Sequence, residues 1–262
     1  MTDLNLTLYG ETLHIHYIDE GSGKPVLFLH GWGARGETYR CILDMLSPYM
    51  RVIAPDMPGF GQSDEPSFGY GTEHYAGFVR AFMKELGIDR AVVIGHSHGG
   101  RVALFLAENP PEDFTVSKLI LIDSAGLIRK KSFAQKCKIA RYKAAKFFLG
   151  SALVKRISPD ALEKLRRRNG SADYAAASPV MRQSMVKVIN ENLRPSLSSI
   201  SVPTLLIWGD RDTDTPPEHA EIMEKEIPDC GLVMIRGGGH FSFLTDPDLT
   251  RRVLHSFLNI LP

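Results

Sequence analysis

Cysteine and net charge are both scarce in this chain. Only three cysteines occur in 262 residues, and they show neither a C-x-x-C motif nor the spacing of a zinc site. An odd, sparse set of this kind favours a reducing compartment over a disulfide framework. The formal net charge is only +1, so the chain as a whole lacks the basic excess that draws proteins onto nucleic acid, and we expect no nucleic-acid partner.

Long apolar runs and targeting signals are also missing. Nowhere does the sequence contain the run of about 18 apolar residues that a membrane-spanning helix needs. The first residues lack the basic region and apolar region of a secretory signal. We therefore expect a cytoplasmic protein without a membrane span.

The composition is that of an ordinary globular protein. Hydrophobic residues make up 44% of the chain and charged residues 23%, proportions that exclude a disordered, collagenous or coiled-coil protein. The length fits one large α/β domain, or a core with a smaller insertion, better than two independent domains.

Short apolar runs alternate with amphipathic stretches along the chain. Six such runs are typical of strands covered on both faces: residues 26–29, 52–54, 91–94, 119–122, 205–208 and 232–235. Before them, residues 4–8 and 13–18 alternate with period two and predict an antiparallel edge pair. The pattern predicts a mostly parallel eight-stranded sheet flanked by helices.

Several helix starts are also visible. Apolar residues keep a helical period from Tyr75 to Leu86. The sequence Thr215-Pro216-Pro217-Glu218 has the form of a capping box with proline in the first helical turn, and Asp246-Pro247 opens a final amphipathic helix.

Residues 127–197 depart from the strand and helix rhythm and predict three successive helices. An apolar stripe extends from Phe133 to Phe147, and Ser158-Pro159 and Ser178-Pro179 each combine an N-cap residue with proline. We expect residues 127–197 to form a helical cap, with residues 1–126 and 198–262 forming the core domain.

The predicted cap is strongly basic. It contains 17 Lys and Arg side chains against four acidic ones, a net charge of +13, while the remainder of the chain carries −12. Charges on the outer faces of amphipathic helices are usually just solvated. Attraction of an anionic substrate or of a membrane surface is the alternative explanation.

Ser97 lies in a sequence that predicts a sharp turn from strand to helix. Gly95 and Gly99 flank it in the pattern G-x-S-x-G, an apolar strand precedes it, and an apolar helix follows. Small residues are needed there because such a turn brings two backbones close together. The start of a helix beneath Ser97 would also favour negative charge developing at that point.

A serine nucleophile needs a base and a group that orients the base. His240 follows the last predicted strand, so it should lie at the carboxyl edge of the sheet, where Ser97 also emerges. The loop after residues 205–208 carries three carboxylates, Asp210, Asp212 and Asp214, any of which could orient the imidazole.

Four separated motifs together resemble the α/β-hydrolase superfamily, in particular its lidded serine esterase-like branch. In chain order they are His30-Gly31-Trp32-Gly33, Asp56-Met57-Pro58-Gly59-Phe60-Gly61-Gln62-Ser63, the turn at Ser97, and the late aspartate and histidine loops. The likeness covers nearly the whole chain and implies the α/β-hydrolase fold with a cap.

The resemblance also implies roles for individual residues. The family pattern Gly-x-x-Asp-x-x-x-Pro matches Gly209, Asp212 and Pro216, which selects Asp212 as the triad acid. Asp210 is the main rival. Asp123 is a further alternative, because some relatives place the triad acid after the strand that corresponds to residues 119–122. The backbone N–H groups of Trp32 and His98 would form the oxyanion hole. His98 is a departure, because many relatives carry Met, Leu or Phe there.

The sequence therefore predicts a serine hydrolase with the triad Ser97, Asp212 and His240, acting through an acyl-enzyme on small acyl esters. Nothing in it provides a cofactor or metal site. Hydrolysis of carbon–carbon bonds or lactones, and a ligand receptor with weak turnover, remain alternatives. Epoxide hydrolases and haloalkane dehalogenases are also similar, but they carry Asp where this chain has Ser97. The substrate, which could be anionic, and the oligomeric state stay open, and we expect His30 and His96 to be hydrogen-bonded structural residues.

Overall fold

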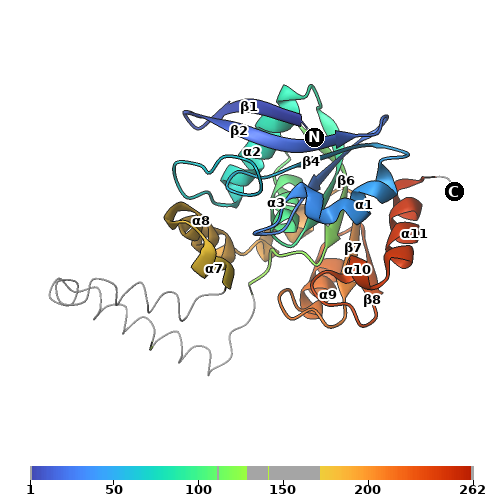
Figure 1. The fold of residues 1–262 in the computed structure, drawn as a ribbon. Coiled ribbons are helices and arrows are strands. Elements are labelled where there is room, and N and C mark those ends of the chain that lie inside the picture. The colour runs from blue at the N-terminus through green and yellow to red at the C-terminus, as the bar shows by residue number, and fades with distance from the viewer. Residues whose placement is uncertain (1, 111, 129–140, 142–171, 261–262) are drawn as a thin grey trace.

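An eight-stranded sheet forms the centre of the computed structural model, which describes residues 2–110, 112–128, 141 and 172–260 (Figure 1). The spatial order of the strands is β1-β2-β4-β3-β5-β6-β7-β8. Their bounds are β1 Thr2–Leu8, β2 Glu11–Glu20, β3 Pro25–Leu29, β4 Arg51–Pro55, β5 Arg90–His96, β6 Thr115–Ile122, β7 Thr204–Gly209 and β8 Cys230–Ile235. All eight predicted strands are present, and the predicted fold class is confirmed.

Strand direction follows the hydrophobic pattern. Strand β2 pairs antiparallel with β1 and β4, whereas the six strands from β4 to β8 pair in parallel. Every residue of β7 is buried, as the continuous apolar run predicts, while β1 at the edge exposes part of its length. Because parallel strands end at one edge, the loops that follow β3, β5, β6, β7 and β8 lie close together.

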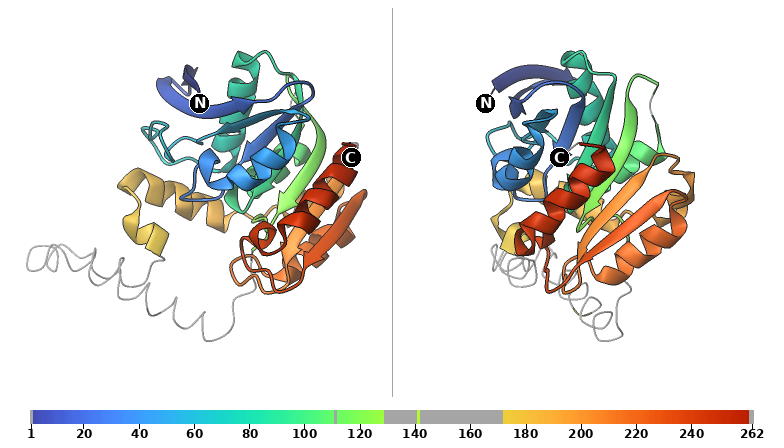
Figure 2. Two further views of the ribbon diagram at one scale, coloured as in Figure 1. Left: turned by 45° about the vertical axis from the view of Figure 1, so that its right-hand side comes forward. Right: turned by 90° about the vertical axis from the view of Figure 1, so that its right-hand side faces the viewer.

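Helices cover both faces of the sheet (Figure 2). Helices α2 (Thr72–Glu85), α3 (His98–Glu108) and α9 (Pro217–Glu226) bury their apolar residues in the core on one face. Helices α1 (Arg40–Leu46) and α11 (Pro247–Leu258) pack on the other face. The shorter elements are η1 (Gly36–Tyr39), η2 (Arg194–Ser199) and α10 (Ser242–Thr245).

Part of the predicted cap can be described. Helices α7 (Ala172–Ala176) and α8 (Pro179–Asn190) lie beside the segment that joins β4 to α2 (Figure 1). The hydroxyl of Ser184 on α8 accepts from the Tyr70 N–H at 2.8 Å, and Lys187 donates to the Gly69 carbonyl at 2.7 Å. The apolar stripe from Phe133 to Phe147 and the Ser158-Pro159 helix start lie outside the described residues, apart from Arg141.

The predicted helix starts have different outcomes. Ser178 caps α8 by accepting from the Met181 N–H at 3.1 Å, and Asp246 caps α11 by accepting from the Leu249 N–H at 2.9 Å. The capping box at Thr215 is wrong, because α9 begins at Pro217 and Pro216 occupies the cap position. The hydroxyl of Thr215 is instead within 2.6 Å of Asp212.

None of the helices that the structure describes has both the length and the apolar character needed to cross a membrane.

Candidate active site

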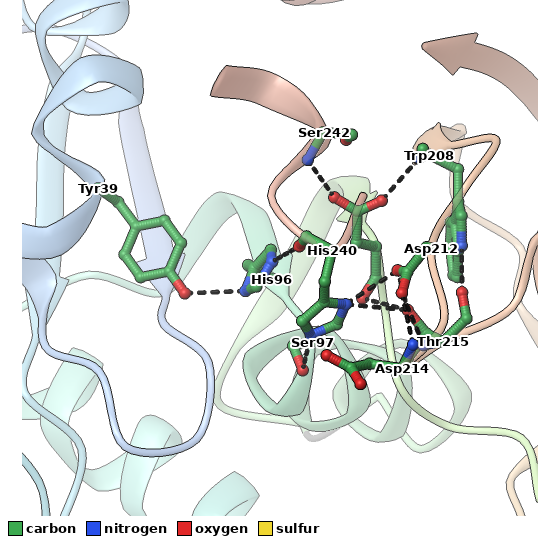
Figure 3. A network of polar contacts seen from close by, with 11 residues as sticks. Tyr39, His96, Ser97, Trp208, Asp212, Asp214, Thr215, His240 and Ser242 are labelled. Atoms are coloured by element: carbon green, nitrogen blue, oxygen red, sulfur yellow. Dashed lines mark hydrogen bonds and ion pairs between the residues drawn. The ribbon is translucent and has the colours of Figure 1, made fainter. Parts of the chain in front are cut away.

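The predicted site residues gather at the carboxyl edge of the parallel strands. Ser97 follows β5 directly, Asp212 lies in the loop after β7, and His240 lies in the loop after β8. Although 143 residues separate Ser97 from His240 in the sequence, the two side chains are in contact. Figure 3 shows the polar contacts around them.

Ser97 lies on a strained turn between β5 and α3. Its φ of 50° falls in the left-handed region that side chains other than glycine rarely adopt. A Cβ added to Gly95 would lie 2.5 Å from the Gly99 carbonyl oxygen, and one added to Gly99 would lie 2.0 Å from the Leu29 carbonyl oxygen. The two glycines are thus required by close backbone approach, and the turn holds the Ser97 hydroxyl at the edge of the sheet.

A continuous chain of hydrogen bonds joins the three predicted catalytic side chains. Ser97 Oγ lies 2.9 Å from His240 Nε2, and His240 Nδ1 lies 2.9 Å from Asp212 Oδ2. The carboxylate of Asp212 can only accept, so Nδ1 carries a proton and Nε2 is free to accept from the hydroxyl. This is the tautomer that a general base requires.

Both carboxylate oxygens of Asp212 accept hydrogen bonds. Oδ1 accepts from the Asp214 N–H at 2.8 Å and from the Thr215 N–H at 3.0 Å, while Oδ2 accepts from the Thr215 hydroxyl and from His240. The residue is buried, with 3% of its surface exposed. Four hydrogen bonds therefore fix the carboxylate in one orientation.

The pKa values of the pair are shifted in complementary directions. Burial alone raises the pKa of Asp212, but hydrogen bonds from His240 and Thr215 outweigh it and hold this pKa below its ordinary value. Burial lowers the pKa of His240, but its hydrogen bond to Asp212 and the charge of Asp212 raise the net value above 6.5. Both shifts show that the contact favours imidazolium beside carboxylate.

Neither rival acid forms the hydrogen bond to the His240 ring, which goes to Asp212. Asp210 is exposed and accepts from the Gly237 N–H at 2.7 Å. Asp123 is fully buried and accepts from the N–H groups of Gly209 at 2.8 Å and Ser242 at 2.9 Å. Burial raises the pKa of Asp123 to about 6. Asp123 thus ties the end of β7 to the start of α10.

The two predicted oxyanion donors lie at the start of α3 and in the loop after β3. His98 is the first residue of α3, where N–H groups have no partner within the helix. No hydrogen bond to a described residue is formed by the N–H of Trp32 or of His98. The rings of these two residues are in edge contact, with centroids 5.3 Å apart.

The His98 side chain is buried among aromatic rings. Tyr75 and Phe60 also contact it, with ring centroids at 4.8 Å and 6.2 Å. Both ring nitrogens are buried without a hydrogen-bond partner among the described residues. Burial, with the charge of Arg101 adding to it, lowers the pKa of His98 to about 3 and keeps the ring neutral.

One group of described residues has the ligand types and spacing of a metal site. Oxygen and nitrogen atoms of Asp212, Asp214 and His240 lie within 4.8 Å of one another. The facing atoms of Asp212 and His240 are already hydrogen-bonded to each other. Two of the three potential ligands are therefore already engaged in the hydrogen bond between imidazole and carboxylate.

Two residues near the site were missed by the sequence analysis. Thr215 supports the Asp212 carboxylate through its hydroxyl at 2.6 Å. Tyr39 reaches His96, 57 residues away, at 2.8 Å. The proline after Thr215 suggested a helix cap instead, and no sequence pattern indicates where the Tyr39 hydroxyl points.

Comparison with known proteins agrees with this architecture. The family model described as the alpha/beta hydrolase fold matches residues 24–247. The AB hydrolase superfamily protein YisY of Bacillus subtilis is 28% identical over 274 residues, covering 98% of this chain and 97% of that protein. Haloalkane dehalogenase 2 of Mycobacterium tuberculosis is 29% identical over 253 residues, covering 89% and 87%.

A solved structure extends the likeness to three dimensions. The esterase EaEST from Exiguobacterium antarcticum superposes with a TM-score of 0.76 at 25% identity, covering 98% of this chain and 100% of that one. The fold, the strand order and the match over most of the sequence show that the chain belongs to the α/β-hydrolase family.

Proposed function

We propose that the chain is a serine hydrolase that acts on carboxylic esters through an acyl-enzyme. The observation that carries this proposal is the unbroken contact from Ser97 Oγ to His240 Nε2 and from His240 Nδ1 to Asp212, each at 2.9 Å. A hydroxyl becomes a useful nucleophile only when a base of this kind lies within hydrogen-bond reach.

The reaction would proceed in two halves. Ser97 Oγ attacks the acyl carbonyl carbon while His240 Nε2 takes the hydroxyl proton, and collapse of the tetrahedral intermediate releases the alcohol with that proton. Water then attacks the acyl-enzyme, gives a proton to His240, and the carboxylic acid leaves as Ser97 recovers its proton. No step needs an oxidant, a reductant or a further reactant.

Two charges develop during the reaction, a positive one on His240 and a negative one on the carbonyl oxygen, and the site would stabilise both. Asp212 stabilises the imidazolium that forms on His240, in line with the raised pKa of that ring. The N–H groups of Trp32 and His98 would receive the oxyanion, a contribution of about 3 kcal/mol for each donor in comparable sites. These are main-chain donors, so their side chains are free to shape the acyl pocket.

Ser97 favours acyl transfer over dehalogenation, despite the likeness to haloalkane dehalogenase 2. Displacement of a halide by an aspartate yields an ester, which water can hydrolyse. The same displacement by a serine hydroxyl would yield an ether, which this arrangement has no means to cleave. Ser97 therefore permits turnover of acyl substrates, because the enzyme can hydrolyse the resulting acyl-serine ester.

The region from residue 127 to 197 is proposed as the cap that closes the site. Helix α8 supports this, since it docks through Ser184 and Lys187 on the segment just before α2. The excess of basic residues in this region favours anionic acyl substrates, including ketoacids cleaved at a carbon–carbon bond, as the second candidate class.

The central test is the Ser97→Ala variant. Hydrolysis of p-nitrophenyl butyrate should fall by about 10⁶-fold in kcat, as removal of the nucleophile does in other triads. A fluorophosphonate probe should label the wild type at Ser97 and leave the variant unlabelled. The matched control is Ser199→Ala, an exposed serine on η2, which should react and hydrolyse as the wild type does.

The same assay separates the alternatives. A panel of esters, lactones and dienoic ketoacids, with Ser97→Ala as blank, gives the preferred bond type. Turnover that survives in Ser97→Ala would refute the proposed nucleophile. A wild type that binds acyl ligands but shows no turnover above the blank would instead indicate a ligand receptor.

A further inference from the structure

A second chain of hydrogen bonds runs beside the proposed triad. The Gly31 N–H donates to Tyr39 Oη at 3.1 Å, Tyr39 Oη lies 2.8 Å from His96 Nδ1, and His96 Nε2 lies 2.7 Å from the His240 carbonyl oxygen. Figure 3 shows Tyr39, His96 and His240 in this order. The chain starts in the loop that carries one oxyanion donor and ends on the backbone of the proposed general base.

The direction of every proton in this chain is fixed. Its two ends are a backbone N–H, which can only donate, and a carbonyl oxygen, which can only accept. His96 must therefore donate from Nε2 and accept at Nδ1, so the Tyr39 hydroxyl donates to it. The ring is neutral, because burial lowers the pKa of His96 to about 3. A single arrangement of protons satisfies all the groups.

Packing holds the chain in place. Tyr39 is fully buried and His96 is 1% exposed. Phe241 stacks on the His96 ring at 5.0 Å, and Phe243 contacts Tyr39 at 5.7 Å. Both phenylalanines belong to the segment that follows His240. The hydrogen bonds through Tyr39 and His96 therefore anchor this segment, and its phenylalanines in turn pack on the two side chains.

The close approach also explains the glycine of the His30-Gly31 motif. A Cβ added to Gly31 would lie 2.9 Å from His96 Nδ1 and 3.0 Å from Tyr39 Oη. A side chain there would push into the hydrogen bond between those two atoms. The close approach of the Tyr39 and His96 side chains thus favours glycine at this position.

We propose that Tyr39 and His96 are positioning residues that hold the oxyanion loop and the His240 imidazole at a fixed distance from each other. This inference rests on the proposed function. Only if the protein is a serine hydrolase do the oxyanion loop and His240, at the two ends of this hydrogen-bond chain, act on the same substrate carbonyl. Neither residue takes part in the chemistry. Each acts through the backbone of a residue that does, at positions where small displacements are costly in rate.

The first test is the Tyr39→Phe variant. It removes one oxygen atom and leaves the Gly31 N–H and His96 Nδ1 without their hydrogen-bond partner. We expect kcat for p-nitrophenyl butyrate and the rate of fluorophosphonate labelling to fall by about tenfold or more, with KM within about twofold of the wild type. The matched control is Tyr70→Phe, a fully buried tyrosine on the α8 side, whose kcat should stay unchanged.

The second test replaces His96. Gln can place an amide N–H near the position of Nε2 and should keep kcat within about threefold of the wild type, whereas Leu removes the donor and should lower it at least about tenfold. In the double variant Tyr39→Phe with His96→Leu, the loss should equal that of His96→Leu alone, since both changes break one chain.

The outcomes separate this inference from the proposed function. If Ser97→Ala abolishes labelling but Tyr39→Phe and His96→Leu label at the wild-type rate, the positioning role is overturned and the hydrolase proposal stands. Strictly additive losses, or equal losses in His96→Gln and His96→Leu, would also overturn it. If Ser97→Ala retains turnover, the proposed function itself fails. Should Tyr39→Phe not fold, the comparison of Gln with Leu at residue 96 decides alone.

Discussion

Replacing Asp212 by Asn should remove activity by imposing the wrong tautomer on His240. Oδ1 of Asp212 accepts from two backbone N–H groups, those of Asp214 and Thr215. The amide of Asn must therefore keep its oxygen on that side, because an NH₂ group there would face two donors. Its NH₂ group then points at His240 Nδ1, which has to accept.

An imidazole that accepts at Nδ1 carries its proton on Nε2. It can no longer take the proton of the Ser97 hydroxyl 2.9 Å away. In a triad where the same substitution left the geometry intact, kcat fell by about 10⁴-fold. That corresponds to about 5 kcal/mol of lost transition-state stabilisation, which we expect here for Asp212→Asn.

The pH profile gives a second, independent readout of this substitution. The general base must be neutral, so kcat/KM of the wild type should fall as the pH drops through the pKa of His240. Because Asp212 raises that pKa, the midpoint should lie above 6.5. In Asp212→Asn the charge of Asp212 is lost while burial remains, so the midpoint of the residual activity should move to lower pH than in the wild type.

Steady-state hydrolysis of p-nitrophenyl butyrate by both proteins over the acidic and neutral range checks both expectations. Asp210→Asn is the matched control, since this exposed acid contacts Gly237 and not the imidazole. A loss in kcat below about tenfold, or an unshifted midpoint in Asp212→Asn, would refute the assignment of Asp212 as the orienting acid.

Two further predictions concern stability. Gly99→Ala should lower the free energy of unfolding by about 3 kcal/mol in denaturant titrations, because its Cβ would meet the Leu29 carbonyl oxygen at 2.0 Å; unchanged stability would contradict the required close approach. His98→Leu should raise the melting temperature by about 2–4 °C, because an apolar side chain replaces a buried ring whose two nitrogens have no hydrogen-bond partner among the described residues. A lower melting temperature would show that the ring is satisfied in the folded protein.

The sequence predicted the fold well where burial alone decides it. The central strands β3, β4, β5, β6 and β7 are continuous apolar runs and are largely buried, as predicted. The run at 232–235 was also predicted to be covered on both faces, and this was wrong, because β8 lies at the edge of the sheet and buries only Ile235. The predicted start of α9 failed for a local reason. Thr215 has the residue type of a helix cap, but its hydroxyl lies 2.6 Å from a carboxylate, and this stronger charge-assisted bond prevails.

The site was predictable to a different degree for each residue. Ser97 is marked by its glycines and His240 by its place after the last strand. Three carboxylates share one loop, and the choice of Asp212 depended on a resemblance, because spacing alone does not say which of them faces inward. Tyr39 was beyond prediction, since its contact with His96 spans 57 residues and depends on how η1 meets the end of β5.

The strand order explains why the site needs buried polar residues that perform no chemistry. Strands β5, β6, β7 and β8 are neighbours in that order, so three strand spacings, about 14 Å, separate the end of β8 from the end of β5. The loop after β8 has to cross that width before His240 can reach Ser97. Asp123, at the end of β6, binds the Ser242 N–H, and His96, at the end of β5, binds the His240 carbonyl. Two backbone anchors that the crossed strands supply therefore support the contact of 2.9 Å between His240, the proposed base, and Ser97, the proposed nucleophile.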